Sequence, residues 1–292
     1  MFRVLLLILL MLPTFFVAHA KESVEVAIAA TAPMADLQTH EQLQAALWVR
    51  TAVEYQVACV QAYELAGMRL PAALADASWT AATEQTDGYQ DLPPAVVLDV
   101  DETVLDNSKF QVRLIAQKRE FSSSRWNDWV NEEKATAVPG VKQFIQLAQK
   151  HKVAVIFLTN RDAAVEAATV RNLSAELGMP VTAEAVHCKG EQPDWTSGKT
   201  ARRRHVAQTH RILLLIGDDF NDFVLLDQLS PEYRTQQGKQ YQPNWGKKWI
   251  QLPNPVYGHW ERAIYDYDFS LSQQQKLRRK YETLGDGDPP TK

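Results

Sequence analysis

The chain of 292 residues contains only two cysteines, Cys59 and Cys188. Two thiols exclude a disulfide-rich scaffold, and they are too few to build a cysteine-ligated metal centre. In an oxidising compartment the two residues could pair, but they lie far apart in sequence. We favour the interpretation that each is a separate, small packing residue in an apolar interior.

An excess of basic charge is also lacking. The chain has 31 Lys and Arg against 35 Asp and Glu, which gives a formal net charge of −4 at pH 7. A chain of this charge does not attract polyanions, so we expect no nucleic-acid partner, although a local site can still hold a small phosphate. The 46% hydrophobic and 23% charged residues indicate neither disorder nor a fibre, and are typical of a globular core.

The first twenty residues differ from the rest of the chain. A short cationic head containing Arg3 precedes an apolar run from Val4 to Val17, and small residues follow at Ala18 and Ala20. The run is short for a bilayer and contains Pro13, so residues 1–20 are predicted to be a cleaved signal peptide. No cysteine follows for lipid attachment. We therefore expect a periplasmic or secreted protein without a stable membrane anchor in its mature form.

Strand and helix patterns alternate along the mature chain. Buried strands are predicted at 95–98, 153–158 and 212–216, and a helix at 141–150. This order predicts an α/β fold, a three-layer Rossmann-like parallel sheet with helices on both faces. Before the sheet, a helical pattern over about 38–67 is expected to end at Gly67 and Pro71.

One segment interrupts the alternation. Residues 105–138 are predicted to form a small, mainly helical cap beside the carboxyl ends of the strands, where ligands bind in open α/β sheets. We expect one core over residues 21–275, which includes the N-terminal helix and this cap. Residues 276–292 are expected to form a flexible tail.

The motif that organises the chain is AVVLDVDETVLDNS at residues 95–108. A short run of apolar residues leads directly into Asp99 and Asp101, so the two carboxylates follow the end of a buried strand. Acidic residues after a strand are often only solvated turn formers. If the two carboxylates converge, their repulsion must be offset, and this predicts a bound divalent metal.

Three later segments make the site more specific. They are VAVIFLTNR at 153–161, SGKTARRR at 197–204 and ILLLIGDDFNDF at 212–223. The first and third are apolar runs that end in polar residues, and the second is basic. Together with the first motif they favour a site for phosphoryl transfer, which needs cations and oriented donors around the phosphoryl oxygens.

In these motifs the sequence resembles the haloacid dehalogenase superfamily of phosphatases, and within it the class C acid phosphatases, the family of lipoprotein e(P4). The resemblance covers roughly residues 95–261. It is carried by Asp99, Asp101, Glu102, Thr103, Asp106, Asn107, Thr159, Asn160, Arg161, Lys199, Gly217, Asp218, Asp219, Asp222, Phe223, and by PNPVYGHWE at 253–261. The haloacid dehalogenase-like fold is the one that this family implies.

Chemistry and resemblance together assign the catalytic roles. Asp99 is the predicted nucleophile, and Asp101 the general acid and base. Thr159 and Lys199 are predicted to hold the phosphoryl oxygens, and the resemblance adds Asn160 as a substrate-binding residue. The basic residues Arg161, Arg202, Arg203 and Arg204 have an alternative interpretation as solvated helix faces, which we favour for the last three.

The expected cofactor is Mg²⁺. Its predicted ligands are Asp99, the main-chain carbonyl of Asp101, and one or both of Asp218 and Asp219. The resemblance favours Asp218 as the direct ligand. Asp222 is expected to lie behind the ligands, where it would orient a water molecule or Lys199.

The resemblance also implies an aromatic clamp for a nucleobase. The matching residues are Trp126 and Tyr257, and Phe110 occupies a position at which the family usually has tyrosine. Aromatic rings at these positions could instead pin the cap to the core, and both interpretations stay open.

The expected function is that of an exported, Mg²⁺-dependent acid phosphatase that hydrolyses small phosphomonoesters, with nucleoside 5′-monophosphates as candidate substrates. One alternative keeps the chemistry but uses sugar or aromatic phosphates, because a fold fixes the reaction better than the leaving group. Another is a non-catalytic phosphate-binding or storage protein. A homo-oligomer is compatible with the sequence, which does not indicate its size.

Overall fold

The computed structural model describes residues 40–226 and 230–285. The expected signal peptide over residues 1–20 lies outside these ranges, as does the end of the chain from residue 286. Within the described part of the chain, no helix combines the length and the apolar character needed to cross a membrane.

A five-stranded parallel sheet organises the described residues. Its strands are β1 (Pro94–Leu98), β4 (Ala154–Asp162), β5 (Val186–Lys189), β6 (Arg211–Gly217) and β7 (Trp249–Gln251). They lie in the order β5-β4-β1-β6-β7, and all neighbouring pairs are parallel. The chain leaves β1 to build β4 and β5 on one side, then returns to build β6 and β7 on the other. The end of β1 is therefore the point where the topology switches direction, which is the usual place for a ligand in such sheets.

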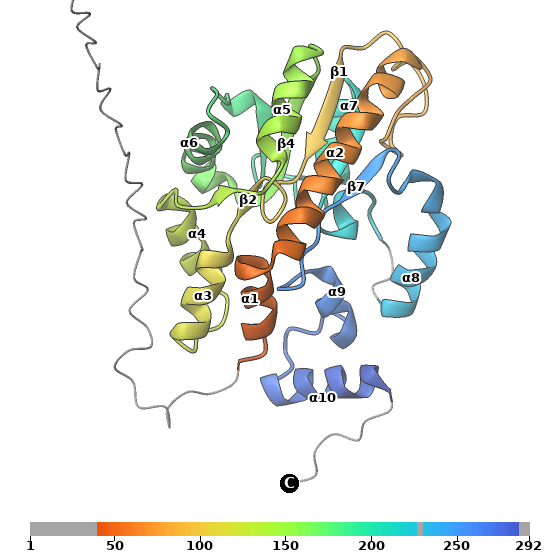
Figure 1. Cartoon of the computed structure of the whole chain (residues 1–292). Coiled ribbons are helices and arrows are strands. Elements are labelled where there is room, and N and C mark those ends of the chain that lie inside the picture. The colour runs from red at the N-terminus through yellow and green to blue at the C-terminus, as the bar shows by residue number, and fades with distance from the viewer. Residues whose placement is uncertain (1–39, 227–229, 286–292) are drawn as a thin grey trace, which may run out of the picture. The chain divides into compact units, whose positions relative to one another are not determined.

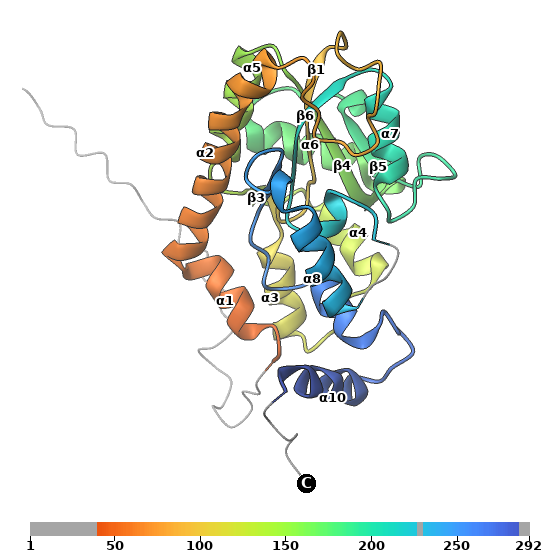
Figure 2. The same ribbon diagram turned by 90° about the vertical axis from the view of Figure 1, so that its right-hand side faces the viewer.

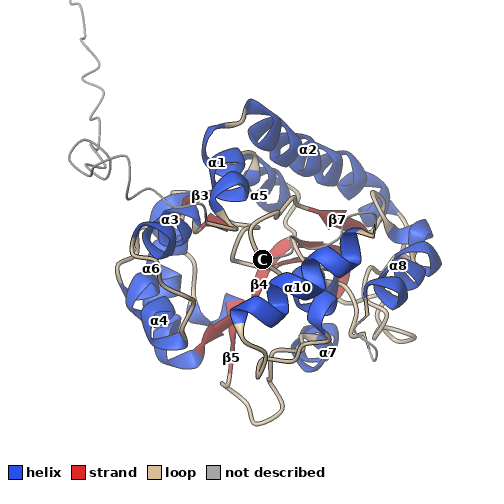
Figure 3. Ribbon diagram, turned by 90° about the horizontal axis from the view of Figure 1, so that it is seen from below, coloured by secondary structure: helices blue, strands red, loops and turns tan. Residues whose placement is uncertain are grey.

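Helices cover both faces of this sheet. The helices that pack on it include α2 (Val53–Ala75), α5 (Val141–Lys150), α6 (Glu166–Leu177) and α7 (Thr200–Ala207). Figures 2 and 3 show α2 and α5 on one side of the strands and α7 on the other.

The alternation of side chains along β1 explains the two covered faces. Val96 and Leu98 join the core built with α2, α5 and α6, whereas Ala95 and Val97 join a second core that includes Val206 of α7. Successive side chains of a strand point to opposite faces, so a strand buried on both sides is apolar throughout. The predicted three-layer α/β fold is confirmed.

The insertion after β1 forms a small subdomain. Its elements are β2 (Leu105–Asp106), α3 (Ser108–Ala116), α4 (Ser123–Asn131) and β3 (Thr136–Ala137). β2 and β3 pair antiparallel. In Figure 1 the helices α3 and α4 lie beyond the end of the sheet toward which the β1 arrow points. The insertion is therefore placed beside the carboxyl ends of the strands.

The helix before the sheet differs from the prediction. It is divided by the extended residue Ala52 into α1 (Leu43–Thr51) and α2, and α2 continues through Gly67 and Pro71 to Ala75. The prediction that Gly67 and Pro71 end the helix was wrong. Gly67 serves close packing instead, because a Cβ atom there would lie 3.0 Å from a methyl group of Leu147 on α5.

The C-terminal part of the chain adds short elements below the sheet in Figure 1. Its helices are α8 (Pro231–Gln240), α9 (His259–Arg262) and α10 (Gln273–Leu284). The short 3-10 turns among the described residues are η2 (Ala163–Val165), η3 (Ala183–Ala185), η4 (Phe220–Asp222), η5 (Gln242–Asn244) and η6 (Ala263–Tyr265). The tail expected to be flexible from residue 276 is thus helical as far as Leu284. Ser272 and Gln275 form a capping box that starts α10, and Lys280 pairs with Glu261 of α9 at 2.7 Å.

Candidate active site

Asp99 is the first residue after β1 and is 8% exposed. Its main-chain N–H donates to the carbonyl oxygen of Ile216 on β6 at 2.9 Å. The ladder between the two central strands therefore continues through Asp99 and fixes its backbone. The carboxylate follows the end of a buried strand, as the sequence predicted, and the strand order places it at the switch point of the sheet.

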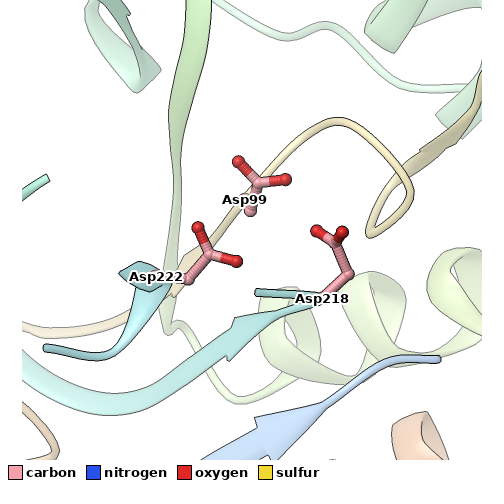
Figure 4. Close-up of side chains that lie close together, drawn as sticks. All are labelled: Asp99, Asp218 and Asp222. Atoms are coloured by element: carbon pink, nitrogen blue, oxygen red, sulfur yellow. The ribbon is translucent and has the colours of Figure 1, made fainter. Parts of the chain in front are cut away.

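Two further carboxylates meet Asp99 there. Asp218 follows the end of β6, and Asp222 ends the 3-10 turn η4. Ligand oxygens of the three residues lie within 4.8 Å of one another, and Figure 4 shows the three side chains converging. Residues up to 123 positions apart in sequence thus form one acidic cluster, made of Asp99, Asp218 and Asp222.

Lys199 partly balances this charge. Its ammonium group contacts Oδ1 of Asp99 and lies 2.7 Å from Oδ1 of Asp222, and its side chain is only 4% exposed. Burial disfavours the lysine cation, but the charges of Asp222 and Asp99 outweigh burial and raise the pKa of Lys199. The lysine is thereby kept as a fixed cation at the nucleophile.

The acidic cluster fits a divalent cation. One buried carboxylate, Asp99, and two partly buried ones, Asp218 and Asp222, face one ammonium group, so negative charge is in excess in a region with little water. Burial, followed by repulsion from Asp222 and Asp99, raises the pKa of Asp218 well above its ordinary value. Hard oxygen donors of this kind suit Mg²⁺ or a similar ion, whose charge would offset the repulsion.

Asp218 is also positioned by its neighbours. Oδ1 accepts a hydrogen bond from the Thr103 hydroxyl at 3.1 Å, and Oδ2 accepts one from the Asn254 amide at 2.8 Å. The Thr103 carbonyl in turn accepts from the Tyr63 hydroxyl of α2 at 2.6 Å. The loop after β1, helix α2 and the segment after β7 thus all orient one carboxylate.

Asp222 contacts Lys199, as expected, and also lies in the acidic cluster, whereas Asp219, one of the two candidate ligands, points elsewhere. Asp219 caps η4, and its carboxylate accepts from the main-chain N–H of His259 at 2.7 Å and lies 3.0 Å from the His259 ring. Burial opposes ionisation of Asp219, but the hydrogen bond and charge of His259 lower its pKa. Asp219 therefore lies outside the acidic cluster that contains Asp222.

Gly217 makes room for Asp222. A Cβ atom on Gly217 would lie 2.3 Å from Oδ2 of Asp222, so any side chain there would displace this carboxylate. The sequence placed Asp222 at the site but behind the ligands, and its position in the acidic cluster follows from the turn η4, which a sequence pattern does not show.

The carboxylate of Asp101 is separate from the acidic cluster. Its Oδ2 lies 3.4 Å from the Thr159 hydroxyl, and its Oδ1 accepts from Arg161 at 2.9 Å. The structure thus brings the predicted general acid close to the predicted phosphate-binding threonine. A direct contact of Asp101 with a metal stays a prediction.

The two arginines at the start of α7 are buried, contrary to the solvated helix face expected for them. Arg202 donates to Oδ1 of Asn160 at 2.7 Å and to the Thr159 carbonyl. Arg203 donates to the Asp222 carbonyl at 2.9 Å and pairs with Glu84 at 2.6 Å. Both side chains support the backbone of predicted site residues. Arg204 is exposed, as expected.

The predicted aromatic residues have different surroundings. Phe110 is 3% exposed and packs edge to face on Trp126 with ring centroids 5.1 Å apart, so Phe110 offers little surface to a ligand. Trp126 is partly exposed. The Tyr257 hydroxyl donates to Oε1 of Glu102 at 2.9 Å. Substrate binding by Trp126 and Tyr257 stays a prediction.

A cavity of about 660 Å³ adjoins the acidic cluster on the side of β7. Asp218 and Asn254 line one part of it, and Phe220, Trp245 and Trp260 supply aromatic surface. Trp260 is 44% exposed. The sequence showed this tryptophan only as part of a motif, and its position beside the cavity was not predicted.

The two cysteines are free thiols, and both are buried, Cys59 in α2 and Cys188 in β5. Burial is the largest cause that raises the pKa of each thiol, to about 11 for Cys59. A buried thiol with a raised pKa is a poor nucleophile. Their predicted role as separate packing residues is confirmed.

The metal-free protein should lose stability as the pH rises. Burial is the largest cause that raises the pKa of Asp99 from 3.8 to about 7 and that of Glu102 from 4.5 to about 8. The folded protein then holds protons that the unfolded chain releases. Their stabilising contribution is complete below the unfolded pKa values and is lost as the pH passes through the folded ones.

We therefore expect the Tm of chelator-treated protein to fall between pH 4.5 and pH 8, by about 2–4 °C for each kcal/mol of stability lost. Thermal melts across this range would measure it. The fall should be smaller in Asp99→Asn, which lacks one of the two groups. A Tm that rises with pH in both proteins would contradict the prediction.

The fold and the site together define a haloacid dehalogenase-like protein, with a carboxylate after the central parallel strand and an acidic cluster at the same sheet edge. The sequence model of the HAD superfamily, subfamily IIIB (acid phosphatase), matches residues 16–260, and the chain belongs to this family. The resemblance seen in the sequence motifs is confirmed.

Solved structures agree with the family. The class C acid phosphatase from Bacillus anthracis is 35% identical, with a TM-score of 0.74 over 85% of this chain and 98% of that chain. A structure of the class C acid phosphatase from Bacillus anthracis with tungstate bound is 34% identical, with a TM-score of 0.73. The stem 28 kDa glycoprotein of Glycine max is 30% identical over 166 residues. That match spans 58% of the plant protein and 55% of this chain.

Proposed function

We propose that the protein is a Mg²⁺-dependent acid phosphatase that hydrolyses small phosphomonoesters through an aspartyl-phosphate intermediate. One observation carries the proposal: Asp99, at the switch point of the sheet, touches the buried ammonium group of Lys199 and lies in the acidic cluster with Asp218 and Asp222. A carboxylate in this position can attack phosphorus while cations hold the phosphoryl oxygens.

In the first step an oxygen of Asp99 forms a bond to phosphorus, and the bond from phosphorus to the ester oxygen breaks. Asp101 gives its proton to the leaving oxygen. In the second step Asp101 takes a proton from water, the water oxygen attacks phosphorus, and the bond to Asp99 breaks. Phosphate is released, and Asp99 is a carboxylate again.

The remaining residues hold the phosphoryl group. Lys199 supplies a fixed positive charge and Thr159 a hydroxyl donor to its oxygens. Asp99, Asp218 and Asp222 would hold the metal ion, which when bound neutralises negative charge on those oxygens. We include Asp222 because it lies in the acidic cluster, where Asp219 does not.

Two features support small monoesters with an aromatic ring as substrates, including nucleoside 5′-monophosphates. Trp126 presents a partly exposed ring on the cap, and the cavity beside Asp218 has aromatic walls. Such surfaces bind flat rings by dispersion and stacking. The saturated ring of a sugar phosphate is not flat and does not stack in this way, so a preference for monoesters with an aromatic ring separates the two substrate classes. The tungstate-bound relative supports phosphate binding, because tungstate is a tetrahedral oxyanion like phosphate.

We further propose that the protein acts outside the cytoplasm. The support is the cationic head, apolar run and small residues of positions 1–20, the pattern of a cleaved export signal. Detection of a mature chain that begins after Ala20 in a periplasmic fraction or culture medium would test this proposal.

The function is tested by phosphate release from a panel of monoesters at pH 5 to 8. The panel contains p-nitrophenyl phosphate, AMP, glucose 6-phosphate and glycerol phosphate. We expect release from all four, faster at acidic pH, and the highest kcat/KM for the two esters with an aromatic ring, p-nitrophenyl phosphate and AMP. In Trp126→Ala this preference should shrink by about tenfold, since stacking on one ring contributes about 1–3 kcal/mol. Lack of release from every ester would contradict the proposed function.

A further inference from the structure

Arg161 lies at the site but has no role in the steps above. It is on β4, two residues after Thr159, and it is fully buried. Its Nε lies 2.9 Å and one terminal nitrogen 2.8 Å from Oδ1 of Asp101. A buried guanidinium that grips one carboxylate oxygen with two nitrogens fixes the orientation of that carboxylate.

Asn107 grips the same oxygen. It lies just before α3, is fully buried, and donates from Nδ2 to Oδ1 of Asp101 at 3.0 Å and to the Leu105 carbonyl at 3.1 Å. Its own Oδ1 accepts from the indole N–H of Trp129 at 2.8 Å and from Arg161 at 3.3 Å. Both ends of the amide are therefore used, which fixes the side chain in one orientation.

The two oxygens of Asp101 thus have unequal surroundings. Three nitrogens from Arg161 and Asn107 surround Oδ1, whereas Oδ2 lies 3.4 Å from the Thr159 hydroxyl. An oxygen that is already saturated with donors cannot readily exchange a proton. Oδ2 is the oxygen left for the leaving group and for water.

We propose that Arg161 and Asn107 are positioning residues, which anchor Oδ1 of Asp101 and so reserve Oδ2 for proton transfer. Trp129 completes this anchor through Asn107. The inference rests on the proposed phosphatase function, in which Asp101 protonates the leaving oxygen. A proton donor held in one orientation is more effective because the geometry needed for transfer is already set.

The anchor also connects the cap to the chemistry. Trp129 and Trp126 are both on α4, and the Trp126 ring lies 5.8 Å from the Arg161 guanidinium. The helix that carries the predicted ring-binding tryptophan therefore also holds the residues that orient the general acid. Displacement of α4 would therefore weaken both the fixed orientation of the Asp101 carboxylate and the binding of the substrate ring.

The test compares two leaving groups. An alkyl alkoxide needs a proton to leave, whereas p-nitrophenolate leaves without one, so a misplaced general acid harms glycerol phosphate far more than p-nitrophenyl phosphate. For Arg161→Lys and Asn107→Ala we expect kcat/KM to fall roughly 10- to 100-fold with glycerol phosphate and by less than about threefold with p-nitrophenyl phosphate.

A milder variant and a control accompany these two. Trp129→Phe keeps a ring but removes the N–H that holds Asn107, and it should show a smaller loss with the same dependence on the leaving group. If Arg161→Lys does not fold, the comparison of the two leaving groups in Trp129→Phe still tests the proposal. The control is Arg171→Lys, which alters an exposed arginine that pairs with Glu133 at 2.6 Å. It should leave kcat/KM unchanged for both substrates.

Equal losses with both substrates in the folded variants would overturn the proposal, because support of the fold alone cannot sense the leaving group. Failure of the proposed function looks different, since the unaltered protein would then release phosphate from neither substrate. Thermal melts of each variant show whether it is folded.

Discussion

Asp99→Asn should abolish phosphate release while leaving the protein folded. The amide has nearly the shape of the carboxylate but cannot attack phosphorus, so we expect a loss on the order of 10⁴-fold or more, as for other enzymes that lose a nucleophile. Stability should not suffer. The substitution removes one of three mutually repelling carboxylates, and Lys199 retains Asp222 as a partner at 2.7 Å.

Release of phosphate from p-nitrophenyl phosphate and thermal melts would measure both effects. The matched control is Asp91→Asn, an exposed carboxylate ahead of β1, which should keep the full rate. A rapid quench of the unaltered protein should show a phosphoryl group on Asp99 by mass spectrometry. If Asp99→Asn released phosphate at a rate within a few fold of the unaltered protein, Asp99 would not be the nucleophile. If the unaltered protein bound phosphate but did not turn over any ester, it would instead be a phosphate-binding protein.

Removal of divalent metal should have a comparable effect. We expect a chelator to reduce phosphate release to background and added Mg²⁺ to restore it, because Lys199 alone does not offset the negative charge of the acidic cluster, which repels a phosphate ester when no metal ion is bound. Mg²⁺ should also raise the Tm of the chelated protein. Binding to the folded state alone stabilises it by about 2.7 kcal/mol at a metal concentration of 100 times Kd.

The shift of Tm with Mg²⁺ distinguishes the two candidate ligands without relying on activity. Asp222→Asn should weaken the shift, because Asp222 lies in the acidic cluster. Asp219→Asn should retain it, because the Asp219 carboxylate is engaged by His259. If Asp219→Asn lost the shift and Asp222→Asn kept it, Asp219 would be the ligand, with Asp222 behind it, as the sequence suggested. If phosphate release were unchanged after exhaustive chelation, the reaction would not depend on a metal ion.

The sequence predicted the fold and the centre of the site because both depend on local patterns. An apolar strand followed by Asp99, and a second one followed by Asp218, place two carboxylates at one edge of any parallel sheet. Lys199 could be assigned because phosphoryl transfer needs a cation and the basic segment follows in the right order. Residue type and strand context were sufficient for these three.

Other features depend on contacts that a sequence pattern does not contain. The choice between Asp222 and Asp219 is decided by η4, which turns one carboxylate inward and the other toward His259. Arg202 and Arg203 look like a solvated helix face because their partners, Thr159 and Glu84, are distant in sequence. Pro71 suggested a helix end because proline disrupts the hydrogen bonds of a helix interior. The continuation of α2 past it to Ala75 depends on tertiary packing, which a sequence pattern does not show.

The segment after β7 holds the site from outside the sheet. Asn254 binds Asp218, Tyr257 binds Glu102 and His259 binds Asp219. Because these three partners follow every predicted catalytic residue along the chain, a nascent polypeptide that already contains all of those residues would still lack the contacts that orient them. The chain should thus acquire its competence only once the segment after β7 has been synthesised, and not at the closure of the central strands.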